Sequence, residues 1–244
     1  MIHITKATKS FQGLFRPVID ETSLSLAHDD FCVLIGANGC GKSTLLKLIS
    51  GEHKADKGEI KLGGEVAQVV QDVNLGTVPE MTLLENIALS QFKKPKLLFY
   101  KRFKDQVIEM LKALDIGLEA YIDQPLKMLS GGQRQMIATL MAVNCGKQIL
   151  LLDEHTSALD PNMQTILMDY TYKQARNRGL TTLMITHKMD DAIKYGNRLI
   201  MLHQGKIVLD IHGRQKKTMA VQDLLAMFHQ YEDQRLTSGD NHVN

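Results

Sequence analysis

The sequence predicts an α/β fold with a mainly parallel core sheet, an antiparallel β layer and an inserted α-helical subdomain. Short apolar runs, each the length of a buried strand, alternate with helix-like patterns; they lie at Phe31–Ile35, Ile149–Leu152 and Thr181–Ile185. Residues 1–27 alternate loosely, which favours strands at the edge of an antiparallel layer. We expect one domain over residues 1–231, with the helical subdomain at about 74–145, and a disordered polar tail at 232–244.

The composition is that of an ordinary globular chain, with 44% hydrophobic and 23% charged residues among 244. A formal net charge of +2 and the absence of tryptophan argue against a nucleic-acid partner. The three cysteines Cys32, Cys40 and Cys145 lack C-x-x-C spacing, which indicates a reduced cytosolic protein without disulfides or a zinc site. The apolar runs are too short to cross a bilayer.

A glycine-rich turn follows the first buried strand and leads into a helix-like pattern. Its spacing is Gly-x-x-x-x-Gly-Lys-Ser, and its marked residues are Gly36, Gly39, Gly41, Lys42 and Ser43. Glycines let successive backbone N–H groups point inward, and the positive end of the helix faces the same place. Lys42 would reach the β- and γ-phosphates, and the Ser43 hydroxyl would ligate Mg²⁺. The alternative is a chance glycine loop, but the strand before and the helix after favour a nucleoside triphosphate.

An aromatic side chain near the end of the first strand region is suited to stack on an adenine ring. Phe11 is the first candidate, and its structural alternative is to cap a hairpin. The insertion between Gly13 and Pro17 makes Phe15 a competing candidate.

The helical region carries weaker signals. The strand Val66–Val70 ends at Gln71, whose carboxamide could ligate Mg²⁺ or water, or simply end the strand. Thr82 and Glu85 have the spacing of a capping box for the next helix. The basic segment Lys93–Arg102 has an apolar centre, which either docks on the core or faces a membrane surface or membrane partner; both interpretations are equally favoured.

Residues 129–133 read LSGGQ and open a further helix. Ser130 and Gln133 have capping-box spacing, so ordinary helix capping is one interpretation. Gly131 and Gly132 are poor helix formers, which a sequence selected for stability alone would avoid. They favour a close approach of bare backbone N–H groups to a phosphate.

Two carboxylates end the buried strand at 149–152. Asp153 could hold Mg²⁺ through water, and Glu154 could polarise an attacking water as general base. A turn then leads to Pro161, which suits the first position of a helix. A lone histidine is usually filler, but His187 ends a strand parallel to that of Asp153 and would lie near the γ-phosphate. His155 and the remaining histidines are interpreted as structural.

The C-terminal part begins with a hairpin. Strands at Leu199–Leu202 and Ile207–Ile211 flank the turn Gln204-Gly205. A closing helix is predicted at Val221–Tyr231.

Together these motifs resemble the ATP-binding subunit of ABC transporters, which has a P-loop NTPase fold. The resemblance covers roughly residues 1–231 and rests on GANGCGKS (36–43), Gln71, LSGGQ (129–133), ILLLDE (149–154), SALD (157–160) and His187. LSGGQ at this distance before ILLLDE is specific to the superfamily, whereas the phosphate loop alone is not. Three departures are His155 where many relatives have proline, the segment MIATLMAVN after LSGGQR, and a short stretch between Gly58 and Gln71. None removes a catalytic group.

The resemblance implies that two subunits, in the simplest case a homodimer, dock head to tail and sandwich two ATP molecules. Each ATP would lie between the phosphate loop of one subunit and the LSGGQ helix start of the other. The implied ATP contacts are Phe11, Gly36, Asn38, Gly39, Gly41, Lys42, Ser43, Thr44, Gln71, Ser130, Gly131, Gly132, Gln133 and Asp160. Mg²⁺ would be held by Ser43, Gln71 and Asp153, while Glu154, His187 and Lys42 would be catalytic. Asp160 would also link the two sites.

The resemblance also implies a transmembrane permease as partner, with a solute-binding protein acting indirectly, at the cytoplasmic face of the inner membrane. DEHTSALDP and THKMDDAIKYGNRLIMLHQGKI resemble a bacterial importer subgroup with a lipoprotein binding protein and a permease like those for branched-chain amino acids. Uptake of a small solute such as an amino acid is therefore expected. The alternatives are an exporter or lipid-extraction ATPase and a soluble non-transport ABC protein; no coiled-coil insertion, second nucleotide domain or basic face supports the last.

Overall fold

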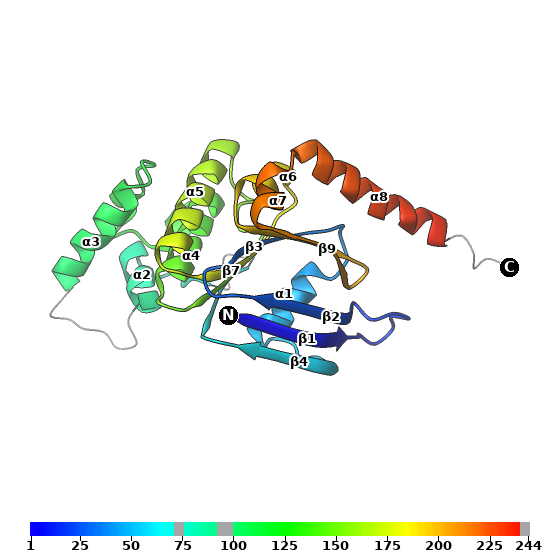
Figure 1. Ribbon diagram of the computed structural model, residues 1–244. Coiled ribbons are helices and arrows are strands. Elements are labelled where there is room, and N and C mark those ends of the chain that lie inside the picture. The colour runs from blue at the N-terminus through cyan, green and yellow to red at the C-terminus, as the bar shows by residue number, and fades with distance from the viewer. Residues whose placement is uncertain (71–75, 92–99, 240–244) are drawn as a thin grey trace. The chain divides into compact units, whose positions relative to one another are not determined.

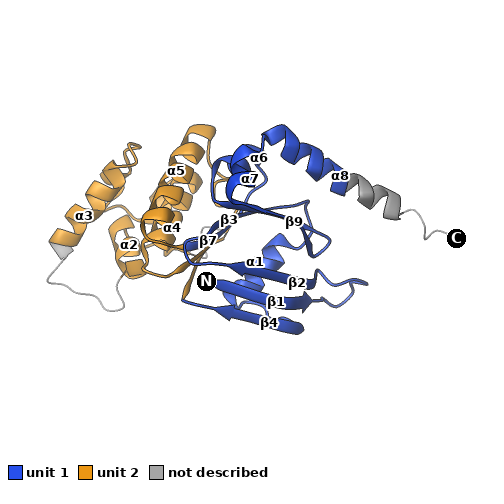
Figure 2. Cartoon of the chain, viewed as in Figure 1, with its two compact units in different colours: residues 1–64, 181–244 blue, residues 65–180 orange. Residues whose placement is uncertain are grey.

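The computed structural model describes residues 1–70, 76–91 and 100–239. These form two compact units, one from residues 1–64 and 181–244 and the other from residues 65–180 (Figure 2). The predicted helical subdomain, at about 74–145, falls inside the second unit.

The first unit contains an antiparallel sheet of three strands with the order β2-β1-β4 (Figure 1). The strands are β1 (Ile2–Lys9), β2 (Ile19–Leu26) and β4 (Lys57–Leu62). The predicted antiparallel layer is thus present, but β1 is its central strand and not an edge strand. The reason is that β1 pairs on its second side with β4, which follows much later in the chain.

The first unit also contains the strand that leads into the phosphate loop. This strand, β3 (Phe31–Ile35), is fully buried and pairs in parallel with β7 (Thr181–Ile185) and β8 (Arg198–His203). Burial on both faces explains why β3 and β7 are continuously apolar. β8 turns back through Gln204-Gly205 into antiparallel β9 (Lys206–His212), as predicted.

In the described part of the first unit the helices are α1 (Lys42–Ser50), α6 (Met189–Lys194), α7 (Gly213–Thr218) and α8 (Val221–Gly239). Helix α8 extends beyond the predicted end at Tyr231, into the segment expected to be a polar tail. The extension is polar, yet four of its eight residues, Glu232, Gln234, Arg235 and Leu236, favour helix, so polarity alone did not mark the end.

The second unit combines a short parallel strand pair with helices. The pair is β5 (Val66–Val69) and β6 (Ile149–Asp153). The helices are α2 (Leu83–Gln91), α3 (Tyr100–Lys112), α4 (Gly131–Asn144) and α5 (Pro161–Asn177), with 3-10 turns η3 (Leu118–Tyr121) and η4 (Leu126–Met128). Apolar side chains from all four α-helices share one core, including Leu84, Val107, Ile137 and Leu167. Parallel strands, an antiparallel layer and inserted helices confirm the predicted fold class.

Candidate functional site

The phosphate loop joins β3 to α1 and depends on glycine for its shape. Gly41, the residue before α1, has a φ of 110°, a region that residues with a Cβ rarely adopt. A Cβ placed there would lie 2.6 Å from the carbonyl oxygen of Val18. Both the backbone angle and the close neighbour therefore require glycine at position 41.

The interior of this loop is lined by polar groups that suit an anion. The ammonium of Lys42 is buried and donates to the carbonyl oxygens of Gly36 and Ala37, at 2.8 and 3.0 Å. No side chain caps the start of α1, so its first-turn N–H groups face no side-chain acceptor. A phosphate at this position would meet those N–H groups, the helix dipole and the lysine together.

The remaining predicted residues of this loop are accessible. Asn38, Gly39 and Ser43 are exposed, while Thr44 is half-buried. Ser43 lies in the first turn of α1, so its hydroxyl oxygen is available as a ligand next to the phosphate position.

His187 follows β7, at the same sheet edge as the phosphate loop. The register pairs Leu34 with Ile185, and the Thr186 amide donates to the Leu34 carbonyl oxygen at 3.3 Å. Because β3 and β7 run in parallel, their carboxyl ends meet at one edge, and His187 is exposed there. The position of His187 near the γ-phosphate stays a prediction.

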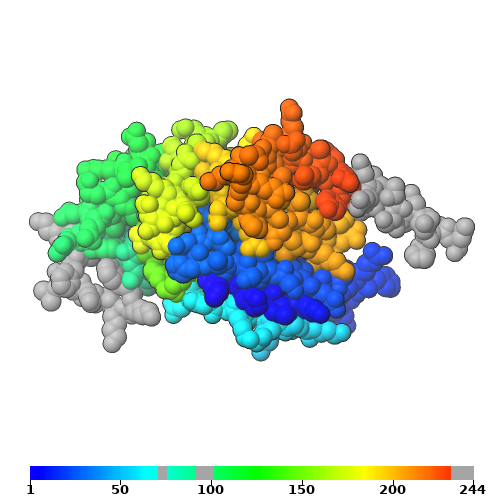
Figure 3. Space-filling view, viewed as in Figure 1, coloured from blue at the N-terminus to red at the C-terminus, as the bar shows by residue number. Residues whose placement is uncertain are grey.

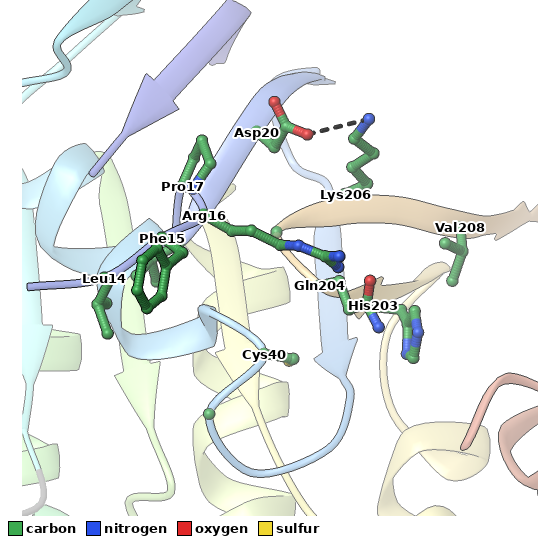
Figure 4. A pocket seen from close by; sticks show the side chains of 13 residues that line it. Leu14, Phe15, Arg16, Pro17, Asp20, Cys40, His203, Gln204, Lys206 and Val208 are labelled. Carbon is green, nitrogen blue, oxygen red and sulfur yellow. Dashed lines mark ion pairs between the residues drawn. The ribbon is translucent and has the colours of Figure 1, made fainter. Parts of the chain in front are cut away.

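A cavity of about 630 Å³ lies beside the phosphate loop, and the sequence did not reveal it (Figure 4). One wall is the β1–β2 connection and the other is the β8–β9 hairpin, which lie side by side at the surface (Figure 3). The Gly205 amide donates to the Cys40 carbonyl oxygen at 3.0 Å, so the hairpin turn is bonded directly to the loop. Asp20 and Lys206 form an ion pair of 3.0 Å across the two walls.

The two candidate aromatics occupy different places in the first unit. The ring of Phe11 is edge-on to the ring of His53, at 5.4 Å between centroids, and the Lys9 ammonium lies 5.6 Å from its centre. Phe15 is fully exposed and lines the cavity with Leu14.

In the second unit, the LSGGQ segment forms the start of α4. The Gln133 amide donates to the Ser130 hydroxyl at 3.2 Å, and the Ser130 amide donates to the Gln133 side chain at 2.9 Å. The predicted capping box is confirmed. A Cβ at Gly132 would lie 2.9 Å from the Leu159 side chain, whereas nothing lies within 4 Å of one at Gly131. The fold therefore does not require glycine at position 131.

The acidic pair ends β6 as predicted. Asp153 is the last residue of the strand and is half-buried. Glu154 follows with a φ of 49°, a left-handed conformation that is uncommon outside glycine and concentrates at functional sites. The carboxylate of Asp160 accepts from the amides of Asn162 and Met163, both at 3.1 Å, and so caps α5.

His155 is buried, in agreement with its structural interpretation. Burial lowers its pKa to about 3, so the ring is neutral at physiological pH. Its Nε2 atom has no hydrogen-bond partner among the described residues.

Gln71 lies outside the described residues, as does most of the basic segment 93–102. Sequence reasoning missed the cavity residues Arg16, His203 and Lys206. The sequence signal available for these residues was the turn at Gln204-Gly205. It predicts that β8 and β9 pair, but it does not predict that the hairpin borders a cavity.

The strand–loop–helix geometry at residues 31–50 is that of a P-loop nucleotide-binding protein, and the capping box shows that Gly131 and Gly132 begin a helix. The sequence profile of the ABC transporter family matches residues 19–157. A tyrosine transport ATP-binding protein of Clostridioides difficile is 38% identical over 93% of this chain and 98% of its own length. A thiamine import ATP-binding protein of Photobacterium profundum is 36% identical over 76% of this chain and 81% of its own length.

Among solved structures, a dimeric bacterial ABC transporter cassette has a TM-score of 0.75 at 25% identity, over 87% of this chain and 98% of that chain. The chain belongs to the ABC transporter family. It is an ATP-binding subunit, and it hydrolyses ATP. Across the described residues, no helix is long and apolar enough to cross a membrane.

Proposed function

We propose that this chain powers a bacterial importer of a small solute such as an amino acid. The observation that carries the proposal is the likeness to the tyrosine transport protein, which extends over 98% of that protein's length. The second relative is named for thiamine import, which supports uptake as the direction of transport. The name of the tyrosine transport protein favours an amino acid as the solute.

The working form is a head-to-tail dimer, in simplest form of two identical chains, that closes on two ATP molecules. Gly131 supports this part of the proposal, because the fold has open space there and does not explain the glycine. The backbone N–H groups at such a helix start would donate to the γ-phosphate of an ATP held by the other subunit. The likeness to a dimeric cassette is consistent with such a pair.

Each residue at the proposed site has a chemical role. The phosphate loop and Lys42 bind the β- and γ-phosphates, and His187 hydrogen-bonds the γ-phosphate as its charge redistributes. Glu154 accepts a proton from water while the water oxygen bonds to the γ-phosphorus. The bond from that phosphorus to the bridging oxygen breaks, and ADP leaves with the bond's electron pair.

Mg²⁺ fits the donor set, since the exposed Ser43 hydroxyl and the Asp153 carboxylate are hard oxygen ligands. When bound, it would neutralise charge on the phosphates. Gln71, as a third ligand and as a link to the membrane partner, remains a prediction outside the described residues.

The partner that receives this energy is a transmembrane permease, with a lipoprotein-type binding protein delivering the solute from the other side. ATP binding closes the dimer and hydrolysis opens it, which biases the permease between inward- and outward-facing states. The chain itself would then lie at the cytoplasmic face of the inner membrane.

The test is a mild detergent pull-down of the tagged chain from its native cells, read by mass spectrometry. We expect a multi-span permease and a solute-binding lipoprotein in the same eluate. Lys42→Ala, which removes phosphate contacts, is carried through the same pull-down to show which partners depend on ATP binding. Recovery of soluble partners alone would overturn the transport role, and a permease whose deletion raises cellular solute would overturn import.

A further inference from the structure

Another cavity, of about 330 Å³, lies within the second unit, between α3 and the C-terminal parts of α4 and α5 (helices labelled in Figure 1). Its volume is at the small end of the range of about 300–1,000 Å³ that is usual for small-molecule pockets. The 14 residues of α4 span about 20 Å, and LSGGQ is at the other end of that helix. The cavity is therefore separate from the LSGGQ helix start, and its size suits a small ligand.

One wall of this cavity is a chain of hydrogen bonds between α4 and α5. Nη2 of Arg178 donates to Oδ1 of Asn144 at 2.6 Å, and Nδ2 of Asn144 donates to the Tyr170 hydroxyl oxygen at 3.0 Å. Nδ2 also donates to the Leu140 carbonyl oxygen at 2.7 Å, so both N–H groups of this amide are used. None of these bonds uses the hydroxyl proton of Tyr170.

The wall is therefore left with donors that have no acceptor among the described residues, namely the Tyr170 hydroxyl and the remaining N–H groups of Arg178. Burial raises the pKa of Tyr170 above its ordinary value, so the hydroxyl keeps its proton at neutral pH. Among the described residues that line the cavity, Arg178 is the one charged side chain. A group that carries negative charge and accepts several hydrogen bonds fits these donors, which is the chemistry of a carboxylate.

The facing wall, on α3, is apolar. Phe103 and Val107 are buried and Met110 is half-buried, and their spacing places all three on one face of the helix. A methionine side chain adapts readily to the shape of a ligand. The part of the ligand that lies away from the carboxylate should therefore be apolar.

A third set of groups can accept hydrogen bonds from a cation. Three carboxamides line the cavity, those of Gln91, Gln106 and Gln174. The last turns of α4 and α5 end beside the cavity, and the negative end of a helix favours a positive charge. An ammonium group attached near the carboxylate would thus also find favourable partners.

A carboxylate, an ammonium group and an apolar side chain are together the groups of an apolar amino acid. We propose that this cavity binds such an amino acid, of the size of leucine or phenylalanine. The ligand would bridge α3 to α4 and α5 and so stabilise the helical part of the second unit. The site is distinct from that of ATP, and it does not depend on which solute is transported.

Isothermal titration calorimetry on the 244-residue chain tests the site, with L-leucine, L-phenylalanine and phenethylamine as ligands. We expect at least one of the two amino acids to bind and to raise the midpoint of thermal unfolding. Phenethylamine, which lacks the carboxylate, should not bind. If neither amino acid binds, the proposal is wrong. Binding of phenethylamine as tightly as phenylalanine would also overturn it, because the carboxylate would then not be recognised.

Two substitutions locate the bound carboxylate. Arg178→Gln removes the charged donor, and Tyr170→Phe removes the hydroxyl proton while keeping the ring. Each should weaken amino-acid binding by about 10- to 100-fold, the range expected for a hydrogen bond to a charged group. Arg176→Gln is the matched control, because it removes the same charge from the same end of α5 but does not line the cavity. MgATP binding should be unchanged in all three variants.

Wild-type affinity for the amino acid in either Arg178→Gln or Tyr170→Phe would contradict the proposed position of the carboxylate. An equal loss in Arg176→Gln would do the same, because the effect would then follow the charge of the helix end and not the cavity. Arg178 is exposed, so its replacement should leave the fold intact. Thermal unfolding without ligand checks this for each variant.

Discussion

Helices α1 and α4 both begin beside glycines, yet their first turns are built differently. The start of α1 has no side-chain cap, and Gly41 adopts a φ of 110° against the Val18 carbonyl. The start of α4 has both hydrogen bonds of a capping box, and Gly131 has open space around its Cα. Backbone angle and crowding both favour glycine at position 41, whereas neither requires it at position 131.

This difference separates two reasons for the same residue. At α1 the backbone of the loop already has a shape that suits an anion. At α4 the helix is already capped and stable, so its bare glycine is of use only to something that approaches from outside the unit. Replacing Gly41 should therefore lower the stability of the protein. Replacing Gly131 should instead lower ATP hydrolysis and leave stability intact.

The largest effect is expected from Glu154→Gln, which tests whether the two helix starts can be held together on ATP. Loss of the proton acceptor should lower turnover by about 1,000-fold and leave ATP binding intact. Phosphate release and size-exclusion chromatography with ATP measure the two effects, with an ATP-stabilised dimer expected. Glu109→Gln, on the exposed face of α3, is the control. Normal hydrolysis by Glu154→Gln would exclude Glu154 as the base.

Replacement of Gly41 by alanine should destabilise the nucleotide-free protein. The left-handed angle and the 2.6 Å approach to Val18 together should lower the free energy of unfolding by about 2–4 kcal/mol. Urea denaturation without ATP measures this. Gly39→Ala is the matched control, because φ is 76° there but nothing lies within 4 Å, so the strain is that of the backbone alone. Equal losses in the two variants would show that the Val18 contact is unimportant.

Gly131→Ala should do the reverse. Alanine favours helix and meets no neighbour, so the free energy of unfolding should stay the same or rise slightly. Steady-state ATP hydrolysis should fall by about 10- to 100-fold, because the added methyl group holds the approaching phosphate away. If activity survives in this variant, α4 does not meet the nucleotide through Gly131.

A smaller effect is expected from Ser130→Ala, which removes the cap of α4. Loss of the bond from the Gln133 amide should cost about 1 kcal/mol of stability. Ser130→Thr retains a hydroxyl acceptor and should recover most of it. Thermal unfolding of the three proteins without ATP distinguishes a capping role from one limited to nucleotide contact.

The smallest effect concerns the thiol beside the phosphate loop. Burial raises the pKa of Cys40 above its ordinary value, so the reactive thiolate is scarce at neutral pH. Alkylation of Cys40 should be slow at pH 7, should keep rising through pH 9, and should be prevented by ATP. Mass spectrometry of the labelled peptide follows the rate. A plateau below pH 8 would contradict a raised pKa.

Local patterns predicted the parts of the site that form within one stretch of chain. The phosphate loop, the capping boxes at Thr82 and Ser130, and the turn at Gln204-Gly205 each depend on residues within a few positions of one another. Their physical causes are local hydrogen bonds and backbone angles. Short stretches of sequence were therefore enough to predict these three features.

The features that the sequence did not predict depend mainly on contacts between distant segments of the chain. The cavity lies between residues 14–20 and 203–208, which no short-range pattern connects. The central place of β1 follows from its pairing with β4, and the positive φ of Glu154 from the turn after β6. The roles of Gln71 and of the other predicted ligands stay predictions.

The bond between the Gly205 amide and the Cys40 carbonyl oxygen has a practical consequence. This amide proton can exchange with deuterated solvent only when the hairpin separates from the phosphate loop. The exchange rate of this proton therefore reports how often the hairpin and the phosphate loop separate. The measurement needs neither a chemical label nor ATP hydrolysis. Nucleotides, permease fragments and variants could all be ranked by how strongly they slow that one proton.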